Sequence, residues 1–197
     1  MATSHRRLSS PEPSPHATYD LRLVPLPVRA ARLMLSGRLR TARPSNLRPE
    51  PDKSRPEPVE GHQPAWHRQY PLPDSIDAIA MLFAAHRAML GTVGKSPQWW
   101  IHQIVVDDVV VGDIGFHGPP GPELAVEIGY SVVPAWRGRG VASRACALIL
   151  QQAWQDGADT VVAETDADNV ISQTVLLRNG FQRRPDGVFS INRPEAR

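Results

Sequence analysis

The chain has too few cysteines and too short apolar runs to suggest a secreted or membrane protein. Its single cysteine, Cys146, cannot form a disulfide within the chain, which fits a reducing cytoplasm. No apolar run approaches the roughly 20 residues that span a bilayer, and residues 1–16 lack the apolar stretch of a secretory signal. We therefore expect a cytoplasmic protein that does not enter a membrane.

Aromatic and basic residues are also too sparse to suggest nucleic acid as a partner. Residues 1–75 hold 12 Lys and Arg against 7 Asp and Glu, whereas residues 76–197 hold 10 against 13. The arginines of this basic arm are scattered among few aromatic side chains, which favours a solvated arm over an RNA-binding one. His62 and His67 lack Cys or acidic partners at metal-ligand spacing, so no metal is expected.

Length and composition predict one domain with two irregular segments. A chain of 197 residues can bury a substantial core as one unit, which we place at residues 18–197. Residues 1–17 are rich in Ser, Pro, Arg and His and are expected to be disordered. Residues 41–67 form a Pro-rich loop in which Arg48–Pro51 is repeated as Arg55–Pro58. Such a loop is either a lid over a substrate or an inserted passenger, and the repeat favours the passenger.

Hydrophobic periodicity predicts an α/β (α+β) fold with a sheet of mixed direction. Strands are predicted at residues 19–26, 99–106, 109–116, 126–133, 160–165 and 188–191, and helices at 28–39, 73–84, 141–154 and from Asp168 or Asn169 to Gly180. Asp107-Asp108 lies between two of these strands and indicates a hairpin. Because a strand–helix–strand unit implies parallel pairing, residues 160–165 should lie beside residues 126–133.

The stretch Val126–Ala142 organises the rest of the chain. Its alternating apolar residues predict a strand that ends at Pro134, which has no amide to donate to a sheet. A helix that begins near Val141 points its free amides and its positive dipole end at the preceding loop. That loop contains small and basic residues: Arg137, Gly138, Arg139, Gly140 and Ala142. The pattern predicts a phosphate-binding cradle; the alternative is a tight turn whose glycines only permit positive φ.

Two motifs in this order resemble the GNAT superfamily of N-acetyltransferases. Arg137-x-x-Gly140-x-Ala142, between a strand and a helix, is similar to the acetyl-CoA-binding loop of that superfamily. The run Asp166–Phe181 is similar to the second half of the domain, especially in the ribosomal-protein-acetylating (RimJ/RimL-like) branch. The resemblance covers residues 70–182. It implies a mostly antiparallel sheet of about six to seven strands, helices on both faces, and a splayed parallel strand pair that holds acetyl-CoA.

The resemblance also implies which residues bind acetyl-CoA as the acyl donor. Backbone groups of the strand would pair with the pantetheine arm, the loop would hold the phosphates, Asn169 would hydrogen-bond the arm, and Ser172 would approach the thiol. The implied cofactor-binding residues are Val132, Val133, Arg137, Gly138, Arg139, Gly140, Val141, Ala142, Asn169 and Ser172. Solvation is the alternative for the two arginines; helix capping is the alternative for Asn169 and Ser172, and it is compatible with binding.

The acceptor amine must lose a proton, and Glu127 is our first candidate for the base. Alternation places its side chain opposite Val126 and Ile128, and acidic residues on this strand often serve in the families that the chain resembles. The alternative is an ordinary solvent-facing carboxylate. Glu164 is a second choice. His117, at a strand end, is a candidate for the acceptor pocket, with a surface role as the alternative.

One position departs from the pattern of the family. Many members place a tyrosine, as general acid, four residues before the Gly–Phe pair, and this sequence has Leu176 there. The RimJ/RimL-like branch often has an apolar residue at that position, so activity is not excluded, but the proton donor to the CoA thiolate is left unassigned. Tyr130 lies on the face opposite Glu127, so core packing is expected for it. Cys146 is expected to be a core residue rather than a nucleophile.

These observations predict an acetyl-CoA-dependent N-acetyltransferase in which Glu127 and Ser172 are catalytic candidates. It would transfer the acetyl group directly to a primary amine, either a protein N-terminus or a small-molecule amine. The non-enzymatic alternative is an acyl-CoA-binding sensor or interaction module. An RNA-associated protein would need salt-sensitive affinity that disappears on deletion of residues 1–67. A homodimer is left open, because a truncated final hairpin would let a partner subunit complete the acceptor pocket.

Overall fold

Eight strands of the described residues form one mixed sheet. The computed structural model describes residues 19–36, 64–90 and 99–195 of the chain. The strand order is β1-β3-β4-β5-β6-β8-β7, with the short β2 beside β4. All neighbours pair antiparallel except β5 with β6 and β2 with β4. The strands are β1 (Leu21–Pro25), β2 (Ala65–Trp66), β3 (Ile101–Val106), β4 (Val109–Phe116), β5 (Ala125–Val132), β6 (Thr160–Ala163), β7 (Gln182–Arg183) and β8 (Phe189–Asn192).

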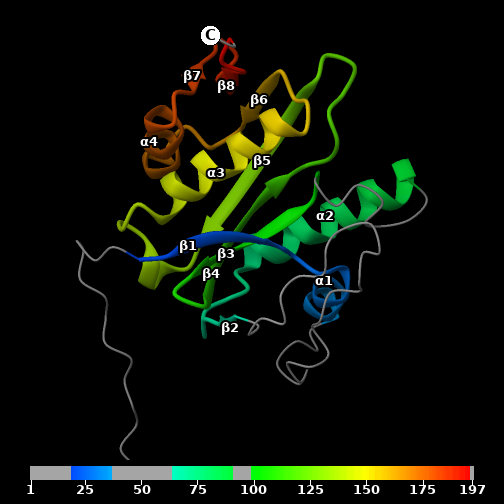
Figure 1. Ribbon diagram of the computed structural model, residues 1–197, viewed down its shortest axis with the longest axis vertical. Coiled ribbons are helices and arrows are strands. Elements are labelled where there is room, and N and C mark those ends of the chain that lie inside the picture. The colour runs from blue at the N-terminus through cyan, green and yellow to red at the C-terminus, as the bar shows by residue number, and fades with distance from the viewer. Residues whose placement is uncertain (1–18, 37–63, 91–98, 196–197) are drawn as a thin grey trace, which may run out of the picture.

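Helices lie on both sides of this sheet. They are α1 (Val28–Leu35), α2 (Pro73–Leu90), α3 (Val141–Gln155) and α4 (Val170–Arg178), and a short 3-10 helix, η4 (Pro134–Trp136), precedes α3. α3 contacts β1, β4 and β5 and packs against α4, whereas α2 contacts β5 and α1. Figure 1 shows α1 and α2 gathered at one side of the strands and α3 and α4 at the other. The mixed fold predicted from the sequence is confirmed.

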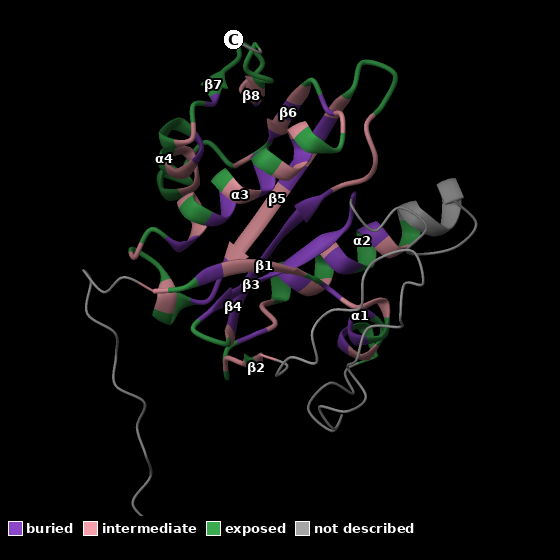
Figure 2. Cartoon of the chain, viewed as in Figure 1, coloured by how far each residue is buried: buried purple, intermediate pink, exposed green. Residues whose placement is uncertain are grey.

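The centre of the sheet is a buried hairpin. Every residue of β3 is buried, as is every residue of β4 after Val109 (Figure 2). Both strands are rich in apolar residues, but they also bury the polar side chains of His102, Gln103 and Asp113. Asp107 and Asp108 join them with φ values of 47° and 63°. Positive φ at both central residues is the turn whose twist matches the flanking strands, so the predicted hairpin is confirmed.

β5 and β6 pair only at one end and then separate. Their parallel register runs from Ala125 opposite Thr160 to Glu127 opposite Val162 and stops there. β5 nevertheless continues to Val132 and stays paired with β4 along its other edge. The predicted splay is therefore present. It leaves the edge of β5 beyond Glu127 open toward α4.

Both irregular segments fall mostly outside the described residues. The disordered arm predicted at residues 1–17 lies wholly outside them, as does most of the loop predicted at 41–67. The last residues of that loop are described, and there Ala65–Trp66 forms β2 and pairs with β4. The first helix is described to Leu35, and the predicted end at Leu39 lies outside. Within the described residues, no helix is both long and apolar enough to cross a membrane.

Candidate functional site

The loop before α3 has the geometry of an anion cradle. Gly138 and Gly140 have φ values of 72° and 75°, in the left-handed region where glycine is favoured. Gly140 is the N-cap of α3, and nothing lies within 4 Å of the position that a Cβ of Gly138 would occupy. The amides of the first helical turn have no acceptor within the helix, and the positive end of the helix dipole adds to them. Val141 and Ala142 supply the first of these amides.

The two arginines of the cradle are anchored to its own backbone. Arg137 donates from Nε to the carbonyl oxygen of Val132 at 2.8 Å. Arg139 donates from Nε to the carbonyl of Ala135 at 3.2 Å, and its guanidinium lies 5.8 Å from the centre of the Trp136 ring. These contacts keep two positive charges beside the loop amides. The predicted positions of both arginines at an anion site stay predictions.

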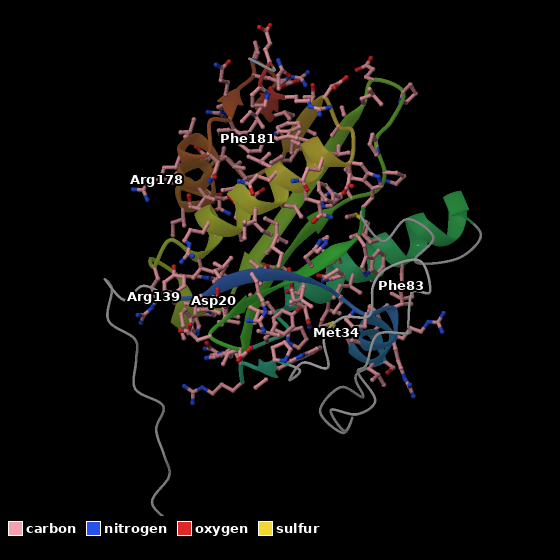
Figure 3. The ribbon with its side chains drawn as sticks, viewed as in Figure 1. Asp20, Met34, Phe83, Arg139, Arg178 and Phe181 are labelled. Atoms are coloured by element: carbon pink, nitrogen blue, oxygen red, sulfur yellow. The ribbon has the colours of Figure 1, made fainter. Side chains whose placement is uncertain are left out.

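Tyr19, which precedes β1, contacts the cradle, and this contact was not predicted from the sequence. Its hydroxyl donates to the carbonyl of Arg139, and its ring meets the Trp136 ring edge to face at 6.0 Å. Arg144 of α3 lies over the Tyr19 ring at 4.7 Å and donates to the Tyr19 carbonyl at 3.1 Å. Figure 3 labels Arg139 and also Asp20, the residue that follows Tyr19 in the chain. No local motif could show it, because the partners lie about 120 residues apart.

A cavity of about 400 Å³ opens where β5 and β6 separate. We call it the donor cavity. Its lining comprises Ile128, Gly129, Tyr130, Ala163, Glu164, Thr165, Asp166, Asn169, Ser172 and Leu176. Asn169 caps α4 by accepting from the Ser172 amide at 3.1 Å, so the predicted capping role is confirmed. The predicted substrate residue Glu164 lies in this cavity, whereas His117 does not.

Tyr130 takes a place in the donor cavity that the sequence did not suggest. It lies opposite Glu127, as alternation predicts, but it is only partly buried. Its hydroxyl makes a 2.8 Å hydrogen bond with the Ser172 hydroxyl. Burial raises the pKa of Tyr130 to about 12. Core packing alone is therefore an incomplete account of this residue, and its hydroxyl is part of the site.

The open edge of β5 carries the backbone groups of alternate residues. The Val133 amide donates to Val111 at 2.9 Å, and the Glu127 carbonyl accepts from the His117 amide at 2.9 Å, so odd-numbered residues face β4. By alternation, Tyr130 and Val132 direct their backbone groups to the open edge. Val132 thus directs its amide to the open edge, while its carbonyl oxygen accepts from Arg137. The Val133 amide is used within the sheet, and pairing of either residue with pantetheine stays a prediction.

A second cavity, of about 200 Å³, lies on the other face of β5 beneath α2. We call it the acceptor cavity. Its floor is formed by paired residues of β4 and β5, among which Gly115 lies opposite Gly129. A Cβ on Gly115 would lie 2.6 Å from the Cα of Ile101, and a Cβ on Gly129 would lie 2.9 Å from Nε2 of His117, so both positions leave no room for a side chain. The full lining comprises Asp74, Ala78, Leu82, Ile101, Asp113, Gly115, His117, Gly129, Tyr130 and Ser131.

His117 donates a hydrogen bond to Glu127 at one end of this floor. Nδ1 of His117 lies 3.0 Å from Oε1 of Glu127, and both side chains are partly exposed. The hydrogen bond from His117 holds the pKa of Glu127 below its usual range. His117 lines the acceptor cavity, but Glu127 lines neither cavity. Of this pair, the imidazole is thus the group in contact with the acceptor space.

Asp113 lies at the opposite end of the floor and is buried. Its Oδ1 accepts from the Ser131 hydroxyl at 3.0 Å, and Ser131 shares a 2.8 Å hydrogen bond with Ser75 of α2. Within the described residues, Asp113 Oδ2, Tyr70 Oη and Gln103 Nε2 have no partner in hydrogen-bonding geometry. Burial raises the pKa of Asp113 to about 6. The sequence did not single out this carboxyl group.

Cys146 and His67 line neither of the two cavities. Cys146 is buried on α3, and burial raises the pKa of its thiol to about 12, so the predicted core role is confirmed. In the part of the chain that the structure describes, no cluster of three or more potential metal ligands is found. His62 lies outside that part. His67 accepts at Nδ1 from the Gln69 amide at 3.2 Å.

These features fit a donor such as acetyl-CoA in three places. The left-handed glycines and helix start offer amides to phosphates. The unpaired edge of β5 offers backbone groups to an extended arm. The donor cavity lies beside that edge and contains Asn169 and Ser172. The residues present therefore fit the group.

The chain belongs to the acetyltransferase (GNAT) domain family, which it matches over residues 47–182. It spans slightly less than two thirds of the length of the first solved structures that it resembles. The match includes β2 and much of the segment predicted to be an insertion. A search of curated protein sequences finds no significant match.

Solved structures similar to the chain include several acetyltransferases. A GNAT-family acetyltransferase from Bacillus anthracis is 22% identical with a TM-score of 0.42, over 47% of this chain and 65% of that one. The yncA protein of Salmonella typhimurium, solved with its cofactor acetyl-CoA, is 20% identical with a TM-score of 0.47, over 62% and 76%. The aminoglycoside acetyltransferase AAC(6')-Ib, in complex with coenzyme A, is 12% identical with a TM-score of 0.42, over 48% and 66%. At these identities the likeness concerns the fold alone.

Proposed function

We propose that the protein is an acetyl-CoA-dependent N-acetyltransferase that passes the acetyl group directly to a primary amine. One observation carries this proposal: Gly129 and Tyr130 of β5 belong to the walls of both cavities. A donor at the open edge and an acceptor beneath α2 would therefore meet across a single strand. Reactions between two substrates gain most when the protein holds both in reacting geometry.

The donor side would bind acetyl-CoA through backbone groups. The amides of residues 138–142 would hold the phosphates, and Val132 would pair with the arm along the open edge. Asn169 and Ser172 would contact the arm and the thiol end from α4. When bound, acetyl-CoA supplies an activated acetyl group on a thiol that leaves readily.

The acceptor side favours a cationic amine. Its lining contains the carboxyl groups of Asp74 and Asp113, and the lining residues that the structure describes include no lysine or arginine. Carboxylates attract an ammonium group, and this attraction is strong where water is partly excluded. His117 lines the same cavity and is paired with Glu127, and the two would provide a place for the proton that the amine must lose.

The acceptor is proposed only as a class. A protein N-terminus, as in the RimJ/RimL-like branch, and a small-molecule amine both present a primary ammonium group to this cavity. The acceptor cavity is open at about 200 Å³, which suits the amine and a few flanking atoms of either. A homodimer remains a prediction that the mass of the protein in solution would test.

Thiol release from acetyl-CoA tests the proposal. The wild type is assayed with a panel of small amines and N-terminal peptides, together with Glu127→Gln and its matched control Glu123→Gln, an exposed glutamate before β5. We expect release that depends on one class of acceptor, a loss of about a hundredfold in Glu127→Gln, and little change in Glu123→Gln. Acetyl-CoA binding is measured in parallel by calorimetry.

The sensor alternative predicts a different result in the same experiment. A non-catalytic acyl-CoA-binding module would bind acetyl-CoA tightly and release no thiol with any acceptor in the panel. That pair of results would reject the enzyme proposal. The acceptor cavity favours the enzyme proposal, because a sensor does not require a second cavity that reaches the same strand residues.

A further inference from the structure

The pairing of His117 with Glu127 changes which of them can act as the base. We propose that His117 takes the proton from the acceptor amine, and that Glu127 is a positioning residue that orients the imidazole. This inference rests on the proposed function. It differs from the prediction from sequence, in which Glu127 itself was the base and His117 only lined the pocket.

The orientation of the imidazole is the first argument. Its Nδ1 faces Glu127 at 3.0 Å, and an ionised carboxylate can only accept a hydrogen bond. The proton of a neutral imidazole is therefore held on Nδ1, which leaves the lone pair on Nε2. The same hydrogen bond lowers the pKa of Glu127, which makes its carboxylate a weaker base. Glu127 is thus suited to orient a neighbour.

The position of Nε2 is the second argument. A Cβ atom built on Gly129 would lie 2.9 Å from Nε2 and farther from every other ring atom, so this nitrogen points at Gly129. Gly129 is in the wall that both cavities share. Nε2 therefore lies against a residue of the wall that the two cavities share, where the two substrates would meet. His117 lines the acceptor cavity, whereas Glu127 is in the lining of neither cavity.

The proton transfer balances without a further reactant. The acceptor ammonium gives one proton to Nε2 of His117, and the imidazolium that results is stabilised by the Glu127 carboxylate. The amine nitrogen forms its bond to the acetyl carbon as the carbon–sulfur bond breaks, and the nitrogen loses a second proton. One of the two protons leaves with the CoA thiol and the other leaves through His117 to solvent.

Nitrogen NMR of the imidazole tests the positioning role without any substrate. The protein is labelled at its histidines, and the His117 signals are assigned by their disappearance in His117→Gln. We expect the neutral wild type to carry its proton on Nδ1. In Glu127→Gln the amide can donate to Nδ1, so the proton should move to Nε2, as happens when the carboxylate partner of a catalytic histidine becomes an amide. A wild-type proton on Nε2 would overturn the proposal.

Turnover of the same variants tests the role of His117. We expect His117→Gln and Glu127→Gln each to lower kcat about a hundredfold, with acetyl-CoA affinity kept within about threefold. Glu127→Ala should lose less than Glu127→Gln, because it does not impose the wrong tautomer, and Glu127→Asp should recover part of the activity. The double variant should be no slower than His117→Gln alone, because both changes remove one function. Added imidazole should restore part of the activity of His117→Ala.

The failure modes of the two proposals are distinct. An active wild type whose His117→Gln variant keeps nearly full kcat, while Glu127→Gln loses it, would make Glu127 the base and reject this inference. If the wild type releases no thiol with any acceptor, the proposed function fails, and the tautomer measurement still decides whether Glu127 orients His117. Glu123→Gln and His67→Gln are the controls, since Glu123 is exposed and His67 lies beside Val110 at the other end of β4.

Discussion

The donor side and the acceptor side of β5 serve one proposed reaction, but they are formed by different parts of the chain. The donor side consists largely of backbone: left-handed glycines, the first turn of α3, and the unpaired edge beyond Glu127. The acceptor side consists of side chains on α2, β4 and β5, with His117 and Glu127 at one end and Asp113 at the other. A backbone site tolerates many side chains but depends on where glycine is placed. A side-chain site depends on the identity of each residue.

Replacement of Gly129 by valine is expected to have the largest effect on activity, because this residue belongs to the walls of both cavities. Its side chain would point into the acceptor cavity, and its Cβ would need the place that Nε2 of His117 approaches. We expect kcat/KM to fall about a hundredfold, the loss that a displacement of about 1 Å can cause. Acetyl-CoA affinity, measured by calorimetry, should stay within about threefold. Gly121→Val is the control, because a Cβ there meets nothing within 4 Å. Full activity of Gly129→Val would mean that the substrates do not meet there.

Among the described residues that line the two cavities, only the acceptor side has a buried carboxyl group, that of Asp113. Its folded pKa of about 6 lies above the unfolded value of 3.8, so the folded state prefers the protonated form. The stabilisation from this group is complete below the unfolded pKa and is lost as the pH rises through about 6. Asp113→Asn removes that loss. We expect it to gain roughly 2–3 kcal/mol relative to wild type between pH 4 and pH 7.

Urea denaturation at the two pH values measures this gain. The comparison of wild type with variant at each pH cancels the other carboxyl groups. The exposed Asp77→Asn variant on α2 should differ from wild type by less than about 0.5 kcal/mol at both pH values. If Asp113→Asn loses stability equally at both pH values, the carboxyl group is ionised and paired in the folded protein.

The same contrast between backbone and side chains explains what the sequence could predict. The six longer strands, the hairpin at Asp107-Asp108 and the glycine turn before α3 were predictable, because hydrophobic alternation and glycine spacing are local patterns. The two-residue strands β2 and β7 were not predicted. The capping of α4 by Asn169 was predictable for the same reason. The contacts Tyr19–Arg139, His117–Glu127 and Tyr130–Ser172 were not, because each joins separate segments. Alternation gave the right face for Glu127 and Tyr130, but only the register of β4 against β5 brings His117 to Glu127.

On the donor side, Gly140→Val tests whether the cradle is a backbone site. Gly140 has a φ of 75°, and a β-branched residue there costs about 1–2 kcal/mol or leaves the left-handed region. Either response misdirects the amides at the start of α3. We expect the Kd for acetyl-CoA to rise about tenfold, while kcat at saturation is retained. Gly140→Asn is the matched control and should bind more tightly than the valine variant, because asparagine tolerates this conformation. Equal binding by valine, asparagine and glycine would show that the side chains hold the phosphates.

The smallest effect is expected where the donor side does use side chains, at the hydroxyl pair of Tyr130 and Ser172. Each hydroxyl supports the other at 2.8 Å beside the buried Leu176. Loss of one hydrogen bond is worth about 1 kcal/mol, so Tyr130→Phe and Ser172→Ala should each lower kcat about fivefold. The double variant should be little worse than either single change, because one interaction is removed. A fall of a hundredfold in Tyr130→Phe alone would assign Tyr130 as the proton donor to the CoA thiolate, in the place where Leu176 has no proton to give. The donor side would then depend on side-chain identity as much as the acceptor side does.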